Sequence, residues 1–145
     1  MKIGIVGAGT MGGGIAQAFA AAGKYSVTLC DVSVDFANKG LARILARLDK
    51  SVEKGRMDKA AAQKILAAIT AAERNALAGC DLVIEAALED IALKKELFAE
   101  QDKLCPPDTI FATNTSSCSI TAIGSAISRP LTGMHFFNPA ETMKL

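Results

Sequence analysis

Short apolar runs alternate along the chain with segments in which apolar residues recur every three or four positions. The first run, at residues 2–6, leads directly into a glycine-rich segment at 7–12, and a helical pattern follows from Ile15. A second run, at 25–30, ends on Asp31. Such runs are typical of buried strands, and the three- or four-residue spacing indicates helices. These residues therefore predict a strand, a glycine turn, a helix and a second strand that ends in a carboxylate.

The same alternation continues through the rest of the chain. Two further helices are predicted at about 34–54 and 60–68, with Gly55 ending the first and Asp58 capping the second. The remaining predicted elements are strands at 70–72, 81–87, 109–112 and 131–136 and helices at 90–103 and 119–127. This order predicts an α/β fold of Rossmann type, a doubly wound and mostly parallel sheet with an inserted helical hairpin at about 34–69. Ligands of such sheets lie beyond the carboxyl ends of the strands.

The glycine turn has the spacing of a dinucleotide-binding fingerprint. Gly7 permits the tight turn, Gly9 lets a pyrophosphate approach the backbone, and Gly12 allows close packing of helix and strand. The free N–H groups of the first helical turn would then face the phosphates. The residues predicted to bind the cofactor here are Gly7, Gly9, Thr10, Met11 and Gly12. The alternative is a glycine turn that serves packing alone.

Asp31 bears on which dinucleotide binds. It lies 19 residues beyond Gly12, where a carboxylate can accept hydrogen bonds from both hydroxyls of an adenosine ribose. A 2′-phosphate beside it would be repelled, and the next residues, Val32 and Ser33, offer no arginine to receive that phosphate. The sequence therefore favours NAD over NADP, although the motif alone does not exclude FAD.

Composition narrows the class of protein. The 145 residues are enough for one domain with a buried core, and a net charge of +1 gives no field that would attract nucleic acid or an anionic membrane. No apolar run approaches a membrane span and no signal peptide is evident, so a cytoplasmic protein is expected. The four cysteines have no zinc-ligand spacing, and we predict no metal site and reduced, buried thiols.

The single histidine, His135, ends the last predicted strand. A neutral imidazole at the ligand edge could take the proton of a substrate hydroxyl while hydride leaves the same carbon for a nicotinamide. Ser116, at the end of the neighbouring strand, could bond the same oxygen. The alternative is a structural histidine packed against Phe136 and Phe137.

A basic stripe lies beside the apolar face of the helix predicted at 34–54. Its members recur every three or four residues and include Arg43, Arg47, Lys50 and Lys54. Interleaved Asp49 and Glu53 favour a solvated face. The alternative is a surface that receives a polyanionic substrate.

Four motifs together resemble the NAD-binding domain of the 3-hydroxyacyl-CoA dehydrogenases, including the bacterial 3-hydroxybutyryl-CoA dehydrogenases. They are Gly-Ala-Gly-Thr-Met-Gly at 7–12, Val-Ile-Glu-Ala at 83–86, Thr-Asn-Thr-Ser-Ser at 113–117 and His-Phe-Phe-Asn-Pro at 135–139. The likeness spans essentially all 145 residues in the same order. It implies NAD-dependent oxidation of an (S)-3-hydroxyacyl-CoA, such as 3-hydroxybutyryl-CoA, to the 3-ketoacyl-CoA, or the reverse, in fatty-acid or butanoate metabolism.

The resemblance also assigns roles to individual residues. It implies a catalytic set of His135, Ser116 and Asn138. It adds contacts to NAD from Glu89, Lys94 and Asn114 to that of Asp31. It favours the substrate interpretation of the basic stripe, so that Lys50, Lys54, Arg47 and Arg43, with Ser116, bind coenzyme A.

The family pattern departs from this chain at its end. In the family, residues after 143–145 continue into a Val-Glu whose carboxylate orients the histidine, and then into an all-helical domain that completes the acyl pocket and a homodimer. The resemblance thus makes 1–145 an NAD-binding domain, from which we expect retained NAD binding and near-absent turnover. Two other functions stay open, a dehydrogenase of a free hydroxy or sugar acid and a non-catalytic NAD-binding module.

Overall fold

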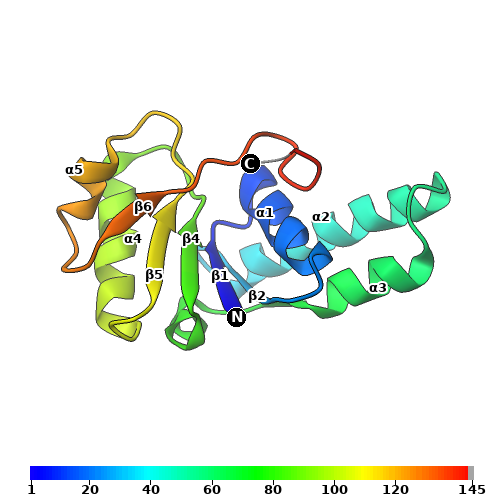
Figure 1. Ribbon diagram of the computed structural model, residues 1–145, viewed down its shortest axis with the longest axis horizontal. Helices are drawn as coiled ribbons and strands as arrows, with labels where there is room; N and C mark the ends of the chain where they lie inside the picture. Colours follow the sequence, from blue (N-terminus) through cyan, green and yellow to red (C-terminus); the bar gives the residue numbers. More distant parts are fainter. Residues whose placement is uncertain (144–145) are drawn as a thin grey trace.

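The computed structural model describes residues 1–143 and contains a six-stranded sheet in which all neighbouring strands are parallel (Figure 1). The strands are β1 Lys2–Val6, β2 Ser26–Cys30, β3 Ile69–Ala71, β4 Leu82–Glu85, β5 Ile110–Thr113 and β6 Leu131–Gly133. Their order, β3-β2-β1-β4-β5-β6, is that of the Rossmann fold and confirms the predicted class. The expected departure from the family pattern follows residue 145 and lies outside the described residues.

Helices cover both faces of the sheet and form two hydrophobic cores. They are α1 Thr10–Ala21, α2 Val34–Glu53, α3 Lys59–Ala67, α4 Ile91–Leu104, α5 Ile120–Gly124 and the 3-10 helix η1 Arg74–Gly79. Because strand side chains alternate between faces, Ile3 and Ile5 join the core under α1, α2 and α3, whereas Val6 joins the core under α4 and α5. Figure 1 shows α2 and α3 projecting from the sheet as the predicted hairpin.

Side-chain caps start every α-helix except α1. The caps are Ser33, Asp58, Asp90 and Ser119, and each accepts a hydrogen bond from a backbone N–H three residues later. Helix α1 instead starts at Gly9, whose position carries no side-chain cap. The first N–H groups of α1 are therefore available to a ligand.

The last strand and helix are shorter than predicted. Strand β6 ends at Gly133 rather than 136, because Asn114 takes over the pairing: its side-chain Oδ1 accepts from the Phe136 N–H at 2.7 Å. Helix α5 ends at Gly124 rather than 127, and residues 125–127 continue only as turns. Residues 134–138 thereby leave the sheet at its carboxyl edge, where His135 and Asn138 were expected.

Three of the four cysteines are buried, as predicted, whereas Cys118 is only partly buried. Cys30, Cys80 and Cys105 are buried, and burial raises the pKa of the Cys30 thiol to about 12. Within residues 1–143, no group of three or more His, Cys, Asp or Glu side chains could hold a metal ion. No helix of this described part is long and apolar enough to cross a membrane.

Candidate functional site

The glycine turn between β1 and α1 has room for a ligand at one position only. Gly7 has a φ of +104°, and a Cβ on Gly12 would lie 1.7 Å from the Gly7 carbonyl oxygen, so the fold itself requires both glycines. A Cβ on Gly9 would meet nothing within 4 Å. The open space above Gly9, at the uncapped start of α1, fits the phosphates of a dinucleotide.

Asp31 lies beside this turn at the end of β2. One carboxylate oxygen accepts from the Ala8 N–H at 2.6 Å and the other from the Val32 N–H at 2.7 Å. Each oxygen keeps a further lone pair, so the orientation of Asp31 is fixed while ribose hydroxyls can still be bound. The residue is thus placed for the predicted ribose contact.

A cavity of about 430 Å³ runs from the glycine turn past Asp31. Its far wall is apolar, with Val32, Leu93 and Leu97, and is suited to an adenine ring. Arg74 also lines this cavity and forms an ion pair with Glu100 of α4 at 3.1 Å. The sequence did not predict a role for Arg74 in the site. The cavity therefore offers a site for the adenosine half of the cofactor.

A second cavity of about 310 Å³ brings the other predicted residues together. Its lining includes Glu89, Asn114, Ser116, His135 and Asn138. The two cavities share Met11, Ala86 and Ala87, so they are contiguous across the sheet edge. Residues predicted to hold the cofactor and residues predicted to perform acid–base chemistry thus line one continuous depression.

The structure orients the imidazole of His135. Its Nδ1 lies 3.1 Å from the backbone oxygen of Asn114, at the end of β5. A carbonyl oxygen only accepts, so Nδ1 carries the proton and donates, which leaves the lone pair of Nε2 free. The ring also packs edge-on against Phe137, with centroids 5.3 Å apart. His135 is therefore held in the tautomer that a general base requires.

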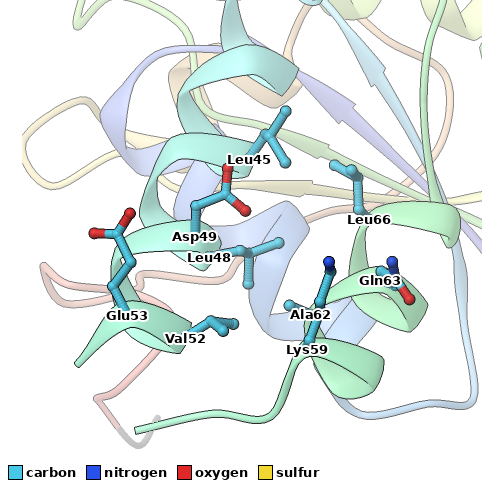
Figure 2. A pocket seen from close by; sticks show the side chains of 9 residues that line it. All are labelled: Leu45, Leu48, Asp49, Val52, Glu53, Lys59, Ala62, Gln63 and Leu66. Carbon is cyan, nitrogen blue, oxygen red and sulfur yellow. The ribbon is translucent and has the colours of Figure 1, made fainter. Parts of the chain in front are cut away.

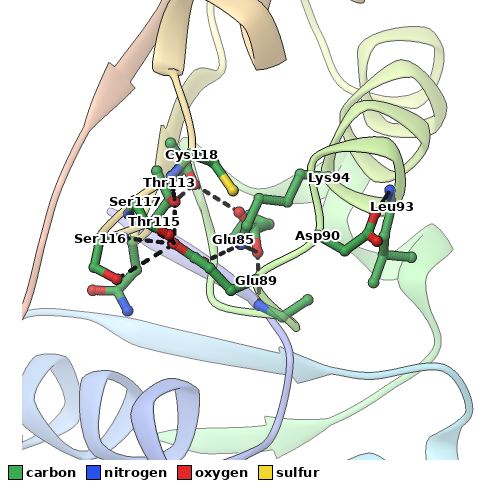
Figure 3. A network of polar contacts seen from close by, with 12 residues as sticks. Glu85, Glu89, Asp90, Leu93, Lys94, Thr113, Thr115, Ser116, Ser117 and Cys118 are labelled. Carbon is green, nitrogen blue, oxygen red and sulfur yellow. Dashed lines mark hydrogen bonds and ion pairs between the residues drawn. The ribbon is translucent and has the colours of Figure 1, made fainter.

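Glu89 accepts several hydrogen bonds from the loop that carries Ser116 (Figure 3). Its Oε1 accepts from the backbone N–H groups of Ser116 at 2.8 Å and Ser117 at 3.0 Å, and from the Thr115 hydroxyl. Burial tends to raise the pKa of the Glu89 carboxyl, but these hydrogen bonds and Lys94 outweigh it and hold the pKa well below its ordinary value. Glu89 therefore presents a negative charge at the cavity wall.

Lys94 lies behind Glu89 rather than in either cavity. Its side chain is only 1% exposed, and its ammonium lies 2.6 Å from Glu85 and 3.3 Å from Glu89. The predicted contact of Lys94 with NAD stays a prediction, and the structure places this lysine one contact away from the lining. The sequence pattern assigned no role to Glu85. A carboxylate at the end of the apolar strand β4 is nevertheless a sign that a buried partner of opposite charge is present.

The basic stripe on α2 divides into two parts. Arg43 donates to the Ala8 carbonyl at 2.8 Å, and Arg47 donates to Gln17 of α1 at 3.3 Å. Lys50 and Lys54 are exposed farther along the hairpin. The arginines thus lie against the glycine turn and α1, and the lysines extend the positive charge outward from that site.

A third cavity, of about 460 Å³, lies between α2 and α3 (Figure 2). Leu45, Leu48, Val52 and Leu66 supply its apolar lining, with Asp49 and Glu53 at its rim. None of the predicted site residues lines it. It is a gap between the hairpin helices and is separate from the depression at the sheet edge.

We expect the protein to lose stability in acid because of two carboxyl groups with lowered pKa values. Besides Glu89, the amide of Ser128 lowers the pKa of Asp102, with help from the Ser128 hydroxyl and Arg129. In the unfolded chain the pKa values of Glu89 and Asp102 are near 4.5 and 3.8, and in the folded chain both pKa values are lower. Their stabilisation is therefore complete above about pH 5 and is lost as the pH falls below it. Urea unfolding at pH 7 and pH 4 measures the difference, and Glu89→Gln should reduce it; a free energy that rises toward pH 4 would contradict the assignment.

Comparison with known proteins identifies relatives along the whole chain. Residues 2–145 match the family model for the 3-hydroxyacyl-CoA dehydrogenase NAD binding domain. The chain is 45% identical over 148 residues to 3-hydroxybutyryl-CoA dehydrogenase of Clostridioides difficile, covering all of this chain and 52% of that protein. It is 44% identical over 146 residues to 3-hydroxyadipyl-CoA dehydrogenase of Escherichia coli, covering 99% of this chain and 30% of that protein.

A solved structure gives the same result. The fold superposes on (S)-3-hydroxybutyryl-CoA dehydrogenase of Ralstonia eutropha with a TM-score of 0.92 and 41% identity, over 98% of this chain and 51% of that one. The chain thus spans about half the length, or less, of the relatives it matches. Their shared part is the cofactor-binding region.

Proposed function

The chain belongs to the 3-hydroxyacyl-CoA dehydrogenase NAD-binding domain family, and from this premise we propose that it forms the cofactor-binding part of an enzyme that oxidises (S)-3-hydroxyacyl-CoA to 3-ketoacyl-CoA and catalyses the reverse. Its cofactor is NAD. The observation that carries the proposal is the continuity of the two cavities, which joins the glycine turn and Asp31 to His135. Substrates of the 3-hydroxybutyryl-CoA type have the strongest support, from the names of the relatives.

The proposed chemistry uses the free Nε2 of His135. Bound NAD supplies the hydride acceptor for the carbon that carries the substrate hydroxyl. His135 removes the hydroxyl proton as the carbonyl forms, and returns it in the reverse reaction. Ser116 lines the same cavity and can hydrogen-bond the reacting oxygen, and Asn138 completes this group. The hydrogen bond to the Asn114 carbonyl keeps the imidazole oriented between turnovers.

Coenzyme A is the part of the substrate that the basic residues of the hairpin are proposed to bind. Its 3′-phosphate-ADP end is a polyanion. Lys50 of α2 and Lys54, which caps the end of that helix, are both exposed and can meet it. Arg43 and Arg47 extend the same positive face to the glycine turn. The proposal includes a cytoplasmic enzyme that works as a homodimer through a helical domain outside residues 1–145.

Titration of the chain with NADH, NADPH and acetoacetyl-CoA tests the proposal. NADH should bind at least about tenfold more tightly than NADPH, because Asp31 repels a 2′-phosphate. Acetoacetyl-CoA should bind in the presence of NADH, as followed by calorimetry. Failure of NADH to bind would exclude the cofactor site, and equal affinity for NADPH would exclude the role of Asp31.

Charge reversal on the hairpin separates coenzyme A substrates from free hydroxy acids. Lys50→Glu/Lys54→Glu should weaken acetoacetyl-CoA binding at least about tenfold and leave NADH binding unchanged. The matched control, Lys59→Glu/Lys64→Glu, reverses the same charge on α3, outside the proposed surface. Equal loss in both double variants would point to a general field and would favour the hydroxy-acid alternative.

A further inference from the structure

Glu85 is a buried carboxylate for which the proposed chemistry has no use. Its exposure is 1%, and both of its oxygens are occupied by donors. Oε1 accepts from the Lys94 ammonium at 2.6 Å and from the Ala87 N–H at 2.7 Å, and Oε2 accepts from the Thr113 hydroxyl at 2.7 Å. Lys94 forms an ion pair with this carboxylate, and its two other partners also donate to it. Glu85 therefore places a full negative charge at the carboxyl end of β4.

Lys94 connects Glu85 to the cavity wall. Its ammonium lies between Glu85 and Glu89, and the shorter contact, by 0.7 Å, is to Glu85. Figure 3 shows Lys94 reaching from α4 across to Glu85, with Glu89 turned toward the loop that carries Ser116. Glu85 thus retains the ammonium away from the cavity, and two carboxylates with one ammonium leave the cluster of Glu85, Lys94 and Glu89 with one net negative charge.

This net charge lies where the proposed function puts the nicotinamide. Glu89 lines the cavity that contains His135, and its side chain is 36% exposed. The nicotinamide ring carries a positive charge when oxidised and none when reduced. A negative cluster at the wall attracts only the oxidised ring, since attraction between charges is strong where little water intervenes.

We propose that Glu85 is a positioning residue that sets the relative affinity for oxidised and reduced cofactor, by holding Lys94 back so that the cluster stays negative beside the nicotinamide. The inference rests on the proposed function, because it needs the ring to lie in the His135 cavity. A residue that only supports the fold would change the affinities for NAD⁺ and NADH by the same factor. The ratio of the two dissociation constants therefore distinguishes the proposed role from a structural one.

The test is Glu85→Gln, which keeps the shape of the side chain and makes the cluster neutral. The affinity for NAD⁺ should fall relative to that for NADH by about threefold or more, as expected for removal of one charge on the order of 10 Å away. Glu96→Gln, which removes an exposed charge on α4, the helix that carries Lys94, should leave the ratio unchanged. Calorimetry with NAD⁺ and fluorescence titration with NADH give the two dissociation constants for each variant and for the unaltered 145-residue chain.

A double variant tests whether the charge is the cause. Glu85→Leu/Lys94→Met removes the buried pair as a unit and leaves Glu89 as the one negative charge of the cluster, so the ratio should stay within about twofold of the original.

If Glu85→Gln does not fold, the carboxyl ¹³C resonance of Glu85 in the unaltered chain decides: an ionised group at pH 7 supports the proposal and a protonated group overturns it.

The remaining outcomes are separable. A chain that binds neither form of the cofactor overturns the proposed function and this inference together. Binding of both forms with a ratio that Glu85→Gln moves by less than twofold overturns this inference alone.

Discussion

Replacing Gly9 by alanine should weaken NADH binding by about thirtyfold or more while the free protein keeps its stability. In the unliganded fold a Cβ at this position would meet nothing within 4 Å, so the variant loses no packing. The added methyl group would instead occupy the space where a pyrophosphate must approach the first turn of α1. Loss of the hydrogen bonds to two or three backbone N–H groups is worth about 2 kcal/mol or more, which is about thirtyfold in affinity.

Gly12→Ala should fail in a different way. Its Cβ would overlap the Gly7 carbonyl oxygen at 1.7 Å, so β1 and α1 would have to separate before any ligand arrives. We expect a loss of at least about 3 kcal/mol in the free energy of unfolding together with loss of NADH binding. Urea unfolding and NADH fluorescence titration on the same samples distinguish the two variants.

Gly79→Ala is the control for the glycine pair. This residue ends η1, and a Cβ there would also meet nothing within 4 Å, but it does not line the proposed cofactor cavity. Both stability and NADH affinity should remain close to the original. If Gly9→Ala bound NADH as tightly as Gly79→Ala does, the cofactor would not cross the glycine turn.

Local sequence patterns were sufficient to predict the strands and the glycine turn. Buried parallel strands are apolar on both faces, so β1, β2 and β4 stand out as runs, and the cap Asp58 marked the start of α3. The carboxyl ends of parallel strands share one edge of the sheet, which is why the sequence alone predicts that Asp31 and His135 belong to one site.

The polar interior could not be predicted in the same way. On α4 the apolar residue Ile91 is 40% exposed, whereas the charged residue Lys94 is buried. A lysine is rarely buried unless it is paired with an opposite charge. The partner of Lys94 is Glu85, which lies nine residues earlier, on strand β4. The early end of β6 has a similar cause, because it depends on the side chain of Asn114 from β5. Such contacts join elements that periodicity treats one at a time.

Replacing His135 by glutamine should lower turnover by a factor of about 100 to 10,000 when residues 1–145 are joined to the rest of a related enzyme. Because the chain alone is expected to turn over very slowly, the measurement needs a chimera in which residues 1–145 replace the matching part of the Clostridioides difficile 3-hydroxybutyryl-CoA dehydrogenase. The 45% identity across that region makes the exchange conservative. The chimera should oxidise 3-hydroxybutyryl-CoA with NAD.

Glutamine is chosen because it isolates the proton transfer. Its amide N–H₂ can still donate to the Asn114 carbonyl, as the Nδ1 of His135 does, but it cannot take up a proton near pH 7. NADH affinity and the thermal midpoint should therefore stay close to those of the unaltered chimera while the rate of the chemical step falls. A variant that keeps more than a tenth of the turnover would make His135 a structural residue, and one that loses NADH binding in parallel would place it in the cofactor site instead. Only a selective fall in turnover agrees with an imidazole whose free Nε2 faces the substrate hydroxyl.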